Sequence, residues 1–256
     1  MTTMQAPTGH PFIAKVRDIY EGFLSFFFPP LCLSCDERLL VGDEVFCDTC
    51  RSCFEFISHP YCELCGAPVT GKLHEEGCCS NCPAPPVHFT RARAALLYQG
   101  AVAEGVIAFK FMRRVEVGEL LARILFVFLK NEMGDVTFDG IVPVPLHFWR
   151  FHKRGYNQAE VMGKVLSDLM NIPLLPEALR RRRATKPQSR LAHSERMANV
   201  GDAFEIAFAQ PISGAHVLLL DDVYTTGSTL NACAKVLKDA GAREVTALTA
   251  CRAISG

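Results

Sequence analysis

The chain has 256 residues, of which 49% are hydrophobic, enough for the core of one ordinary domain and a smaller second unit. Lysine plus arginine and aspartate plus glutamate are equal at 27 each, so the formal net charge is zero. This balance excludes a global electrostatic field that attracts nucleic acid, and any basic surface must be local.

An apolar, aromatic-rich segment spans residues 12–28 and repeats at helical spacing. It is too short and too rich in charge to cross a bilayer, so no transmembrane segment is expected there. We predict an N-terminal amphipathic helix within residues 1–30 that packs on the protein's own core and ends at Pro29. Peripheral attachment to a membrane, or to a partner at a membrane, stays open as the alternative.

Ten of the 12 cysteines fall between Cys32 and Cys82, most of them in C-x-x-C pairs. This pattern is typical of metal binding, whereas disulfides belong to small secreted proteins. The first thirty residues show no secretory signal. We therefore expect a reducing, cytoplasmic location, with the inner face of the membrane as the alternative.

Four C-x-x-C pairs form the basis of a small cysteine-rich module predicted over residues 31–90. Each pair places two sulfurs on one side of a tight turn, and two such turns complete a tetrahedron around Zn²⁺. We expect sequential pairing and up to two structural zinc ions. The first set is Cys32, Cys35, Cys47 and Cys50, and the second is Cys62, Cys65, Cys79 and Cys82. Cys53 and Cys78 are spare, Cys78 remains an alternative ligand to Cys79, and Cys233 and Cys251 are expected to be buried.

An α/β domain is predicted over residues 91–256. Helical patterns at residues 102–111, 117–130, 158–170 and 229–240 alternate with strand-like runs at 140–144, 216–220 and 244–251. Such alternation is typical of a parallel sheet with flanking helices.

The run at residues 216–220 leads into two carboxylates, Asp221 and Asp222, and then a turn rich in hydroxyl groups. Carboxylates at the carboxyl end of a parallel strand face the ligand crevice and accept hydrogen bonds from a ribose diol. The following turn offers free amides at a helix N-terminus, which suits a phosphate, and Gly227 permits close approach. An ordinary N-capped turn explains only one or two of these residues. The loop comprises Asp221, Asp222, Val223, Tyr224, Thr225, Thr226, Gly227, Ser228 and Thr229.

This loop resembles the signature of type I phosphoribosyltransferases, which bind phosphoribosyl diphosphate (PRPP). The resemblance implies the fold of that family, with Asp221 and Asp222 on the ribose hydroxyls, residues 225–229 on the 5′-phosphate, and Mg²⁺ bound with PRPP. It also implies a pyrophosphate loop after residues 140–144, for which the clustered basic residues beyond are suited. A solvated basic loop is the alternative. The candidates for pyrophosphate or phosphate are Lys110, Pro143, Val144, Pro145, Lys153 and Arg154.

A polar stretch at residues 180–199 lies between two core elements. It is either a solvated connection or, by resemblance to amidophosphoribosyltransferases, a lid over bound PRPP, with Arg190 and Arg196 as lid candidates.

The cysteine pairs, the acidic loop and the motif at residues 153–158 together resemble the competence protein F (ComF/GntX-like) family across nearly the whole chain. The resemblance implies a double zinc ribbon ahead of a phosphoribosyltransferase domain. It also implies a role in handling incoming single-stranded DNA, with the DNA-uptake machinery as partner, in natural transformation.

Two functions therefore stay open. In the first, the protein binds PRPP or ribose 5-phosphate and handles DNA, helped by the arginine run at residues 180–183 and by Phe148, Trp149 and Phe151. A solvated face and core packing are the alternatives for these two groups. In the second, it is an active phosphoribosyltransferase that transfers ribose 5-phosphate from PRPP to an amine or nucleobase. No sequence feature identifies an acceptor or a catalytic base.

Overall fold

The computed structural model describes residues 29–40, 44–69, 79, 82–83, 85–181 and 203–254. The predicted N-terminal helix and the lid candidates Arg190 and Arg196 lie outside these residues. The chain divides into two compact units, Met1–Ser52 and Cys53–Gly256, and each is described by itself.

The first unit is a cysteine knuckle followed by the short helix α2 (Asp48–Ser52). An isolated antiparallel bridge joins Leu31 to Arg38, and the amide of Cys32 donates to the carbonyl of Glu37 over 2.7 Å. Val45 and Phe46 are buried. The backbone thus closes a tight turn around the first cysteine pair.

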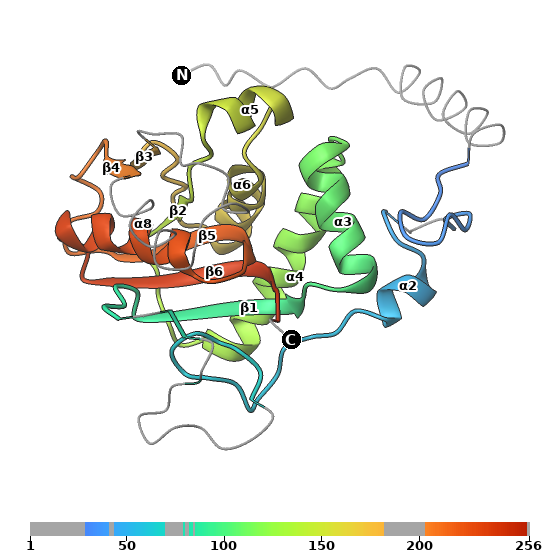
Figure 1. Cartoon of the computed structure of the whole chain (residues 1–256), viewed down its shortest axis with the longest axis horizontal. Helices are drawn as coiled ribbons and strands as arrows, with labels where there is room; N and C mark the ends of the chain where they lie inside the picture. Colours follow the sequence, from blue (N-terminus) through green and yellow to red (C-terminus); the bar gives the residue numbers. More distant parts are fainter. Residues whose placement is uncertain are drawn as a thin grey trace, which may run out of the picture. The chain divides into compact units, whose positions relative to one another are not determined.

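The second unit is built on a parallel four-stranded sheet (Figure 1). Its strands are β1 (Arg91–Leu97), β2 (Gly140–Pro143), β5 (His216–Tyr224) and β6 (Glu244–Arg252), in the order β1-β6-β5-β2. The two central strands are almost wholly buried, as apolar runs in parallel sheets require. The predicted α/β fold with a parallel sheet is confirmed.

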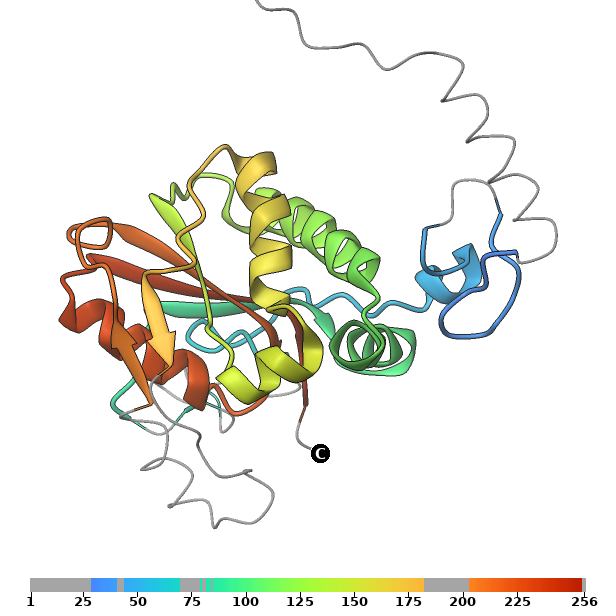
Figure 2. The same ribbon diagram turned by 90° about the horizontal axis from the view of Figure 1, so that it is seen from above.

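Four helices cover the two faces of this sheet (Figure 2). They are α3 (Gly100–Phe111), α4 (Val115–Met133), α6 (Gln158–Met170) and α8 (Ser228–Asp239). Gly163 of α6 lies close to Leu220, whereas Val217 and Leu219 belong to the core under α8. Because successive side chains of a strand alternate between faces, β5 supplies both cores at once. No helix among the described residues is long and apolar enough to cross a membrane.

Two further elements differ from the sequence expectation. Residues beyond Pro145 were expected to form a basic loop, but they form the helix α5 (Phe148–Arg154), with His147 as its N-cap and Gly155 as its C-cap. The His147 ring accepts a hydrogen bond from the amide of Trp149, and Gly155 adopts φ 85°, so both ends are capped locally. The first residues of the polar stretch at 180–199 belong to a strand, β3 (Leu179–Arg181), which pairs antiparallel with β4 (Phe204–Ile206).

The outer edge of β1 is occupied by the segment that precedes it. The amide of Ile57 donates to Ala95, and the amide of Leu97 donates to Glu55, each over 2.9 Å. Further along, the amide of Ala92 donates over 2.8 Å to Leu64, inside the third cysteine knuckle. This knuckle is therefore part of the α/β unit, and Cys62 and Cys65 lie in the same hydrophobic core as the residues under α8.

Candidate functional site

The acidic pair, Asp221 and Asp222, lies near the carboxyl end of β5. Asp222 is buried, and its amide donates to the Asp221 carboxylate over 2.8 Å. The pleat of β5 sends the two side chains to opposite faces of the sheet. Burial, followed by the charge of Asp222, raises the pKa of Asp221 to about 7. Carboxylates on consecutive residues at the end of a strand can accept hydrogen bonds from hydroxyl groups or bind a cation.

Lys110 balances the acidic pair from the last turn of α3. Its ammonium group lies 3.1 Å from Oδ1 of Asp222. Arg154 lies close as well: burial lowers the pKa of its guanidinium, and the carboxylates of Asp222 and Asp221 act in the opposite direction. The structure thus brings two of the basic residues singled out in the sequence to the acidic pair.

The phosphate turn, residues 225–229, joins β5 to α8. Gly227 adopts φ 73° at the N-cap position, and the hydroxyls of Thr226 and Ser228 lie 2.9 Å apart. Thr225 and Thr226 are exposed. The first amides of α8 have no partner within the helix, so the turn presents donors and the positive end of the helix dipole to an anion.

The end of β2 lies beside β5 and is held by Asn157. Its side-chain amide donates to the carbonyl of Val144 over 3.0 Å while its oxygen caps α6 through Ala159. The amide of Val144 donates to Leu220 over 2.8 Å. Pro143 is tolerated because β2 is an edge strand of the sheet. The sequence pattern flagged Asn157 only as part of a family motif, and nothing in it predicted this double contact.

The remaining phosphate candidates are less involved. Pro145 is half-buried and Lys153 is exposed on α5, and no ion pair among the described residues ties Lys153 to the acidic pair. Arg154 instead lies over the ring of Phe111 at 5.2 Å, and its Nη1 donates to Gln158 over 2.9 Å. The hydroxyl of Tyr156 donates a hydrogen bond to the carbonyl of Phe109.

One arginine of the run at residues 180–183 lies near the acidic pair. Arg180 is exposed, whereas Arg181 is half-buried over the Phe204 ring at 5.1 Å. Burial lowers the pKa of Arg181, and the charge of Asp221 raises it. Of the two arginines that the structure describes in this run, Arg180 faces solvent and Arg181 lies near the acidic pair. Arg182 and Arg183 lie outside the described residues.

The cysteines form two tetrads in which the sulfurs lie within 4.8 Å of one another. The first tetrad is Cys32, Cys35, Cys47 and Cys50, and the second is Cys62, Cys65, Cys79 and Cys82. These are the sequential sets expected from the spacing. Four sulfur ligands at tetrahedral distances fit structural zinc and leave no position for water. Cys53 is exposed, and Cys233 and Cys251 are buried as predicted.

Three aromatic residues of α5 face solvent. Phe148, Trp149 and Phe151 are 61%, 70% and 42% exposed. The alternative that they pack in a core is therefore wrong. Basic residues accompany them on this short helix, with Arg150 and Lys153 exposed.

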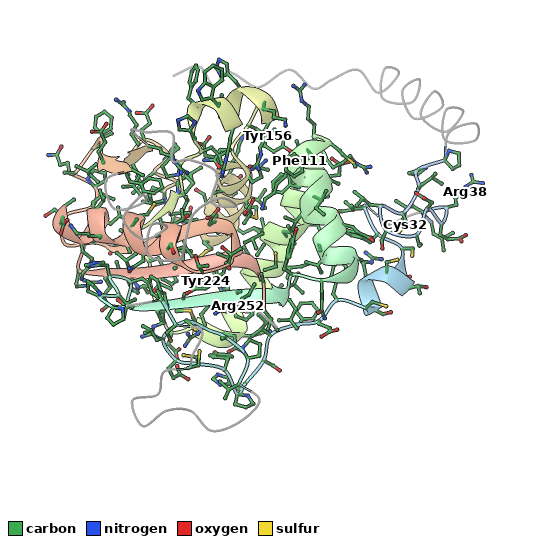
Figure 3. The ribbon with its side chains drawn as sticks, in the orientation of Figure 1. Cys32, Arg38, Phe111, Tyr156, Tyr224 and Arg252 are labelled. Atoms are coloured by element: carbon green, nitrogen blue, oxygen red, sulfur yellow. The ribbon has the colours of Figure 1, made fainter. Side chains whose placement is uncertain are left out.

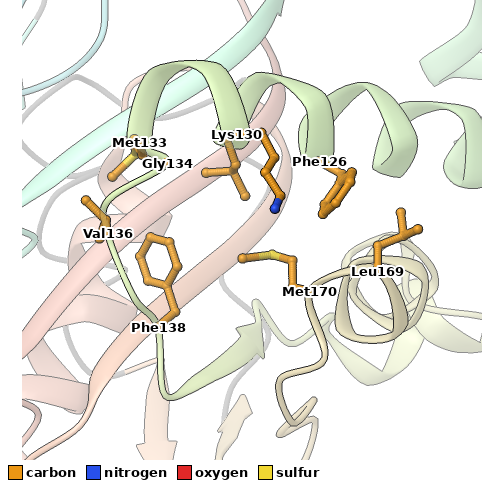
Figure 4. A pocket seen from close by; sticks show the side chains of 9 residues that line it. Phe126, Lys130, Met133, Gly134, Val136, Phe138, Leu169 and Met170 are labelled. Atoms are coloured by element: carbon orange, nitrogen blue, oxygen red, sulfur yellow. The ribbon is translucent and has the colours of Figure 1, made fainter.

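Two cavities lie away from the acidic pair. One, of about 160 Å³, is bounded by the ends of α4 and α6 and contains the Lys130 side chain among apolar groups (Figure 4). The other, of about 490 Å³, lies along α4 beside Phe56 and Glu132. Neither cavity is lined by the acidic pair or the phosphate turn.

Two family models match the chain. The double zinc ribbon domain matches residues 23–83, and the phosphoribosyl transferase domain matches residues 122–256. Among solved structures, a glutamine PRPP amidotransferase from B. subtilis is 18% identical, with 56% of this chain and 30% of that chain covered and a TM-score of 0.39. An adenine phosphoribosyltransferase is also 18% identical over 54% of this chain and 73% of its own, with a TM-score of 0.34.

Curated relatives match over most of the length. Competence protein F of Haemophilus influenzae is 30% identical over 86% of this chain and 95% of its own. DNA utilization protein YhgH of Escherichia coli K12 is 31% identical over 88% of this chain and 98% of its own length. Competence protein ComFC of Bacillus subtilis is 29% identical over 82% of this chain and 90% of its own length.

Proposed function

We propose that the acidic pair and the phosphate turn bind the phosphoribosyl group of PRPP or ribose 5-phosphate. The premise of this proposal is that the chain belongs to the competence protein F (ComF) family. We further propose that this binding serves the handling of incoming single-stranded DNA, because the relatives are named for competence and for DNA utilization.

The observation that carries the proposal is the combination of two carboxylates with an anion-binding turn on one strand end. Asp221 and Asp222 offer acceptors for the ribose 2′ and 3′ hydroxyls, or for Mg²⁺ bound with PRPP. Thr225 and Thr226 offer exposed hydroxyls to the 5′-phosphate, together with the amides that begin α8. Lys110 and Arg154 supply positive charge for a pyrophosphate group.

Calorimetric titration with ribose 5-phosphate, and with PRPP in the presence of Mg²⁺, tests this site. Asp222→Asn and Thr226→Ala should each weaken binding by about 1 to 3 kcal/mol, because each removes a hydrogen-bonding partner of the ligand. Asp239→Asn, which alters an exposed carboxylate on α8, should bind like the unaltered protein. Identical isotherms for all three variants would mean that the turn has only a structural role.

Exposed aromatic residues favour a DNA-binding surface on α5. Phe148 and Trp149 expose most of their rings, and a solvent-exposed ring beside basic side chains is what stacks on unpaired bases. Arg150 and Lys153 supply charge for the phosphate backbone. Because the formal net charge of the chain is zero, any surface that attracts DNA must be local, as the basic and aromatic residues of α5 are.

DNA binding at α5 can be measured through the fluorescence of Trp149, because it is the single tryptophan of the chain. Oligothymidylate should quench its fluorescence, and the apparent affinity should fall as salt rises, since phosphate contacts release counterions. Phe148→Ala should weaken binding about tenfold, whereas Phe208→Ala, also an exposed phenylalanine, should not. Unchanged tryptophan emission at saturating oligonucleotide would contradict the assignment.

An active phosphoribosyltransferase is the alternative for the same site. Positioning and charge neutralisation are the main needs of such a transfer, and the residues around the acidic pair supply both. Release of pyrophosphate from PRPP and Mg²⁺ on addition of an amine or nucleobase, lost in Asp222→Asn, would favour the enzyme. Binding of PRPP without turnover with any acceptor would favour a purely binding role.

A further inference from the structure

Arg252, the last residue of β6, joins the second tetrad to the end of β5. It is only 2% exposed. Its Nη1 donates to the carbonyl of Cys65 over 2.6 Å, and its Nη2 lies 3.5 Å from the Cys65 sulfur. The same guanidinium lies 4.0 Å from the ring centroid of Tyr224, its cross-strand neighbour (Figure 3). One buried cation thus contacts a cysteine of the tetrad and the residue that precedes the phosphate turn.

Tyr224 in turn limits the conformation of the phosphate turn. Its side chain is 1% exposed, so it does not reach outward to a ligand. A Cβ atom on Gly227 would lie 2.3 Å from the Tyr224 hydroxyl and 3.0 Å from Pro83, the residue after Cys82. The turn therefore packs directly against Tyr224 and against Pro83, and no space is left for a side chain at Gly227.

A second connection reaches the first turn of α8. The side chain of Asn231 accepts a hydrogen bond from the amide of His88 over 2.7 Å and donates to the carbonyl of Pro86 over 2.9 Å. His88 and Pro86 follow the second tetrad in the chain. Both sides of the phosphate turn are consequently tied to the segment that the tetrad organises.

We propose that Arg252 is a positioning residue through which the second tetrad holds the phosphate turn in its binding conformation. The proposal rests on the phosphate-binding role proposed above for the turn. Four thiolates around Zn²⁺ leave a net negative charge, which a buried guanidinium stabilises by hydrogen bonding to sulfur. Metal binding at the second tetrad, Arg252 and the turn then form one coupled unit.

Coupling of this kind is reciprocal. If the metal-filled second tetrad favours the binding conformation of the turn, a bound phosphate must strengthen metal binding at that tetrad by the same free energy, and we expect this to appear as slower metal release. Only one of the two zinc ions should respond, since Arg252 contacts Cys65 alone among the described metal ligands.

Hydrogen exchange without any ligand tests the coupling independently of the proposed function. Arg252→Lys keeps the charge but cannot both reach Cys65 and stack on Tyr224. We expect about tenfold faster exchange in residues 224–231, because a charge-assisted hydrogen bond is lost, and unchanged exchange in α6. Arg243→Gln, an exposed arginine, is the matched control. Unchanged exchange in residues 224–231 of Arg252→Lys would overturn the proposal.

Zinc release to a chromogenic chelator supplies the second measurement. Arg252→Gln should speed the release of one zinc ion, and ribose 5-phosphate should slow that same release in the unaltered protein. Cys35→Ser, which removes the first tetrad, should leave the ligand-sensitive release intact. If Arg252→Gln releases both ions at the unaltered rates, the inference fails. If it speeds release but ribose 5-phosphate changes nothing and does not bind, the proposed ligand is wrong and the positioning role stands.

Discussion

The ammonium group of Lys110 lies 3.1 Å from the carboxylate of Asp222, so a cation from α3 partly neutralises the acidic pair at the end of β5. The two side chains are 19% and 11% exposed. Loss of one partner leaves the other charge in a largely buried position, which costs more than loss of a surface pair. This pair connects a helix at one face of the sheet to the centre of the site.

Lys110→Met should therefore reduce the free energy of unfolding by about 2 kcal/mol, measured by urea denaturation at pH 7. Lys235→Met removes an exposed pair with Asp239, whose side chains are 50% and 64% exposed, and should cost less than about 0.5 kcal/mol. Adding Asp222→Asn to Lys110→Met should restore part of the loss. Equal effects of the two lysine substitutions would show that the Lys110 pair is solvated.

The raised pKa of Asp221 predicts a pH dependence of stability. Its pKa moves from 3.8 to about 7, mainly through burial and then through the charge of Asp222. Between these values the unfolded state releases the proton and the folded state keeps it, so stability falls as pH rises towards 7. The variant Asp221→Asn has no carboxyl group at this position, so its stability does not show this fall. The stability of the variant relative to the unaltered protein should therefore increase from pH 5 to pH 7 and level off above pH 8.

Denaturation of both proteins at several pH values measures this difference directly. Each retains the same cysteines, so the pH dependence of zinc binding cancels in the comparison. A difference that is constant with pH would show that Asp221 titrates as an ordinary carboxyl group.

Gly227 and Gly214 offer a matched pair of substitutions. They have nearly the same backbone φ, 73° and 75°, but a Cβ on Gly227 meets Tyr224 whereas a Cβ on Gly214 meets nothing within 4 Å. Gly214→Ala should cost about 1 kcal/mol, from backbone conformation alone. Gly227→Ala should cost about 2 to 4 kcal/mol and weaken ribose 5-phosphate binding, because the turn must move. Similar losses of stability in both variants would place the cost in the backbone and not in the contact with Tyr224.

The two tetrads should differ in what their loss does. Metal analysis should return about two zinc ions per chain, since eight thiols complete two closed sites. Cys65 is buried in the core of the α/β unit, whereas Cys35 is exposed in the first unit. Cys65→Ser should lower the temperature of the main unfolding transition, and Cys35→Ser should remove one zinc ion and leave that transition unchanged. Calorimetry that shows equal shifts would contradict this division.

Much of the α/β unit was predictable because its signals are local. Apolar runs at residues 216–220 and 244–251 required buried strands, and the acidic pair with the hydroxyl-rich turn marked the strand end at which we propose the binding site. The cysteine spacing specified the two tetrads for the same reason. Strand β5 nevertheless extends to Tyr224, because both carboxylates sit within the ladder with β6.

The contacts that position the site were not predictable, because they join residues far apart in the chain. Arg252 ends an apolar strand and has no motif around it, yet it contacts Cys65, 187 residues away. Helix α5 was missed since its seven residues are aromatic and basic, without the apolar spacing that marks a buried helix face. Its ends depend on His147 and Gly155, which are weak signals by themselves.

The segment along β1 has a consequence for the behaviour of the protein without metal. Residues 55–57 and the knuckle at Leu64 occupy hydrogen-bonding groups on the outer edge of this strand. An uncovered edge strand with an apolar sequence is a template for pairing with another chain. The knuckle depends on the second tetrad for its shape. We therefore expect chelation to produce intermolecular β-structure and aggregation, in place of a loosened monomer, so a metal ion bound at this site would protect the protein against self-association.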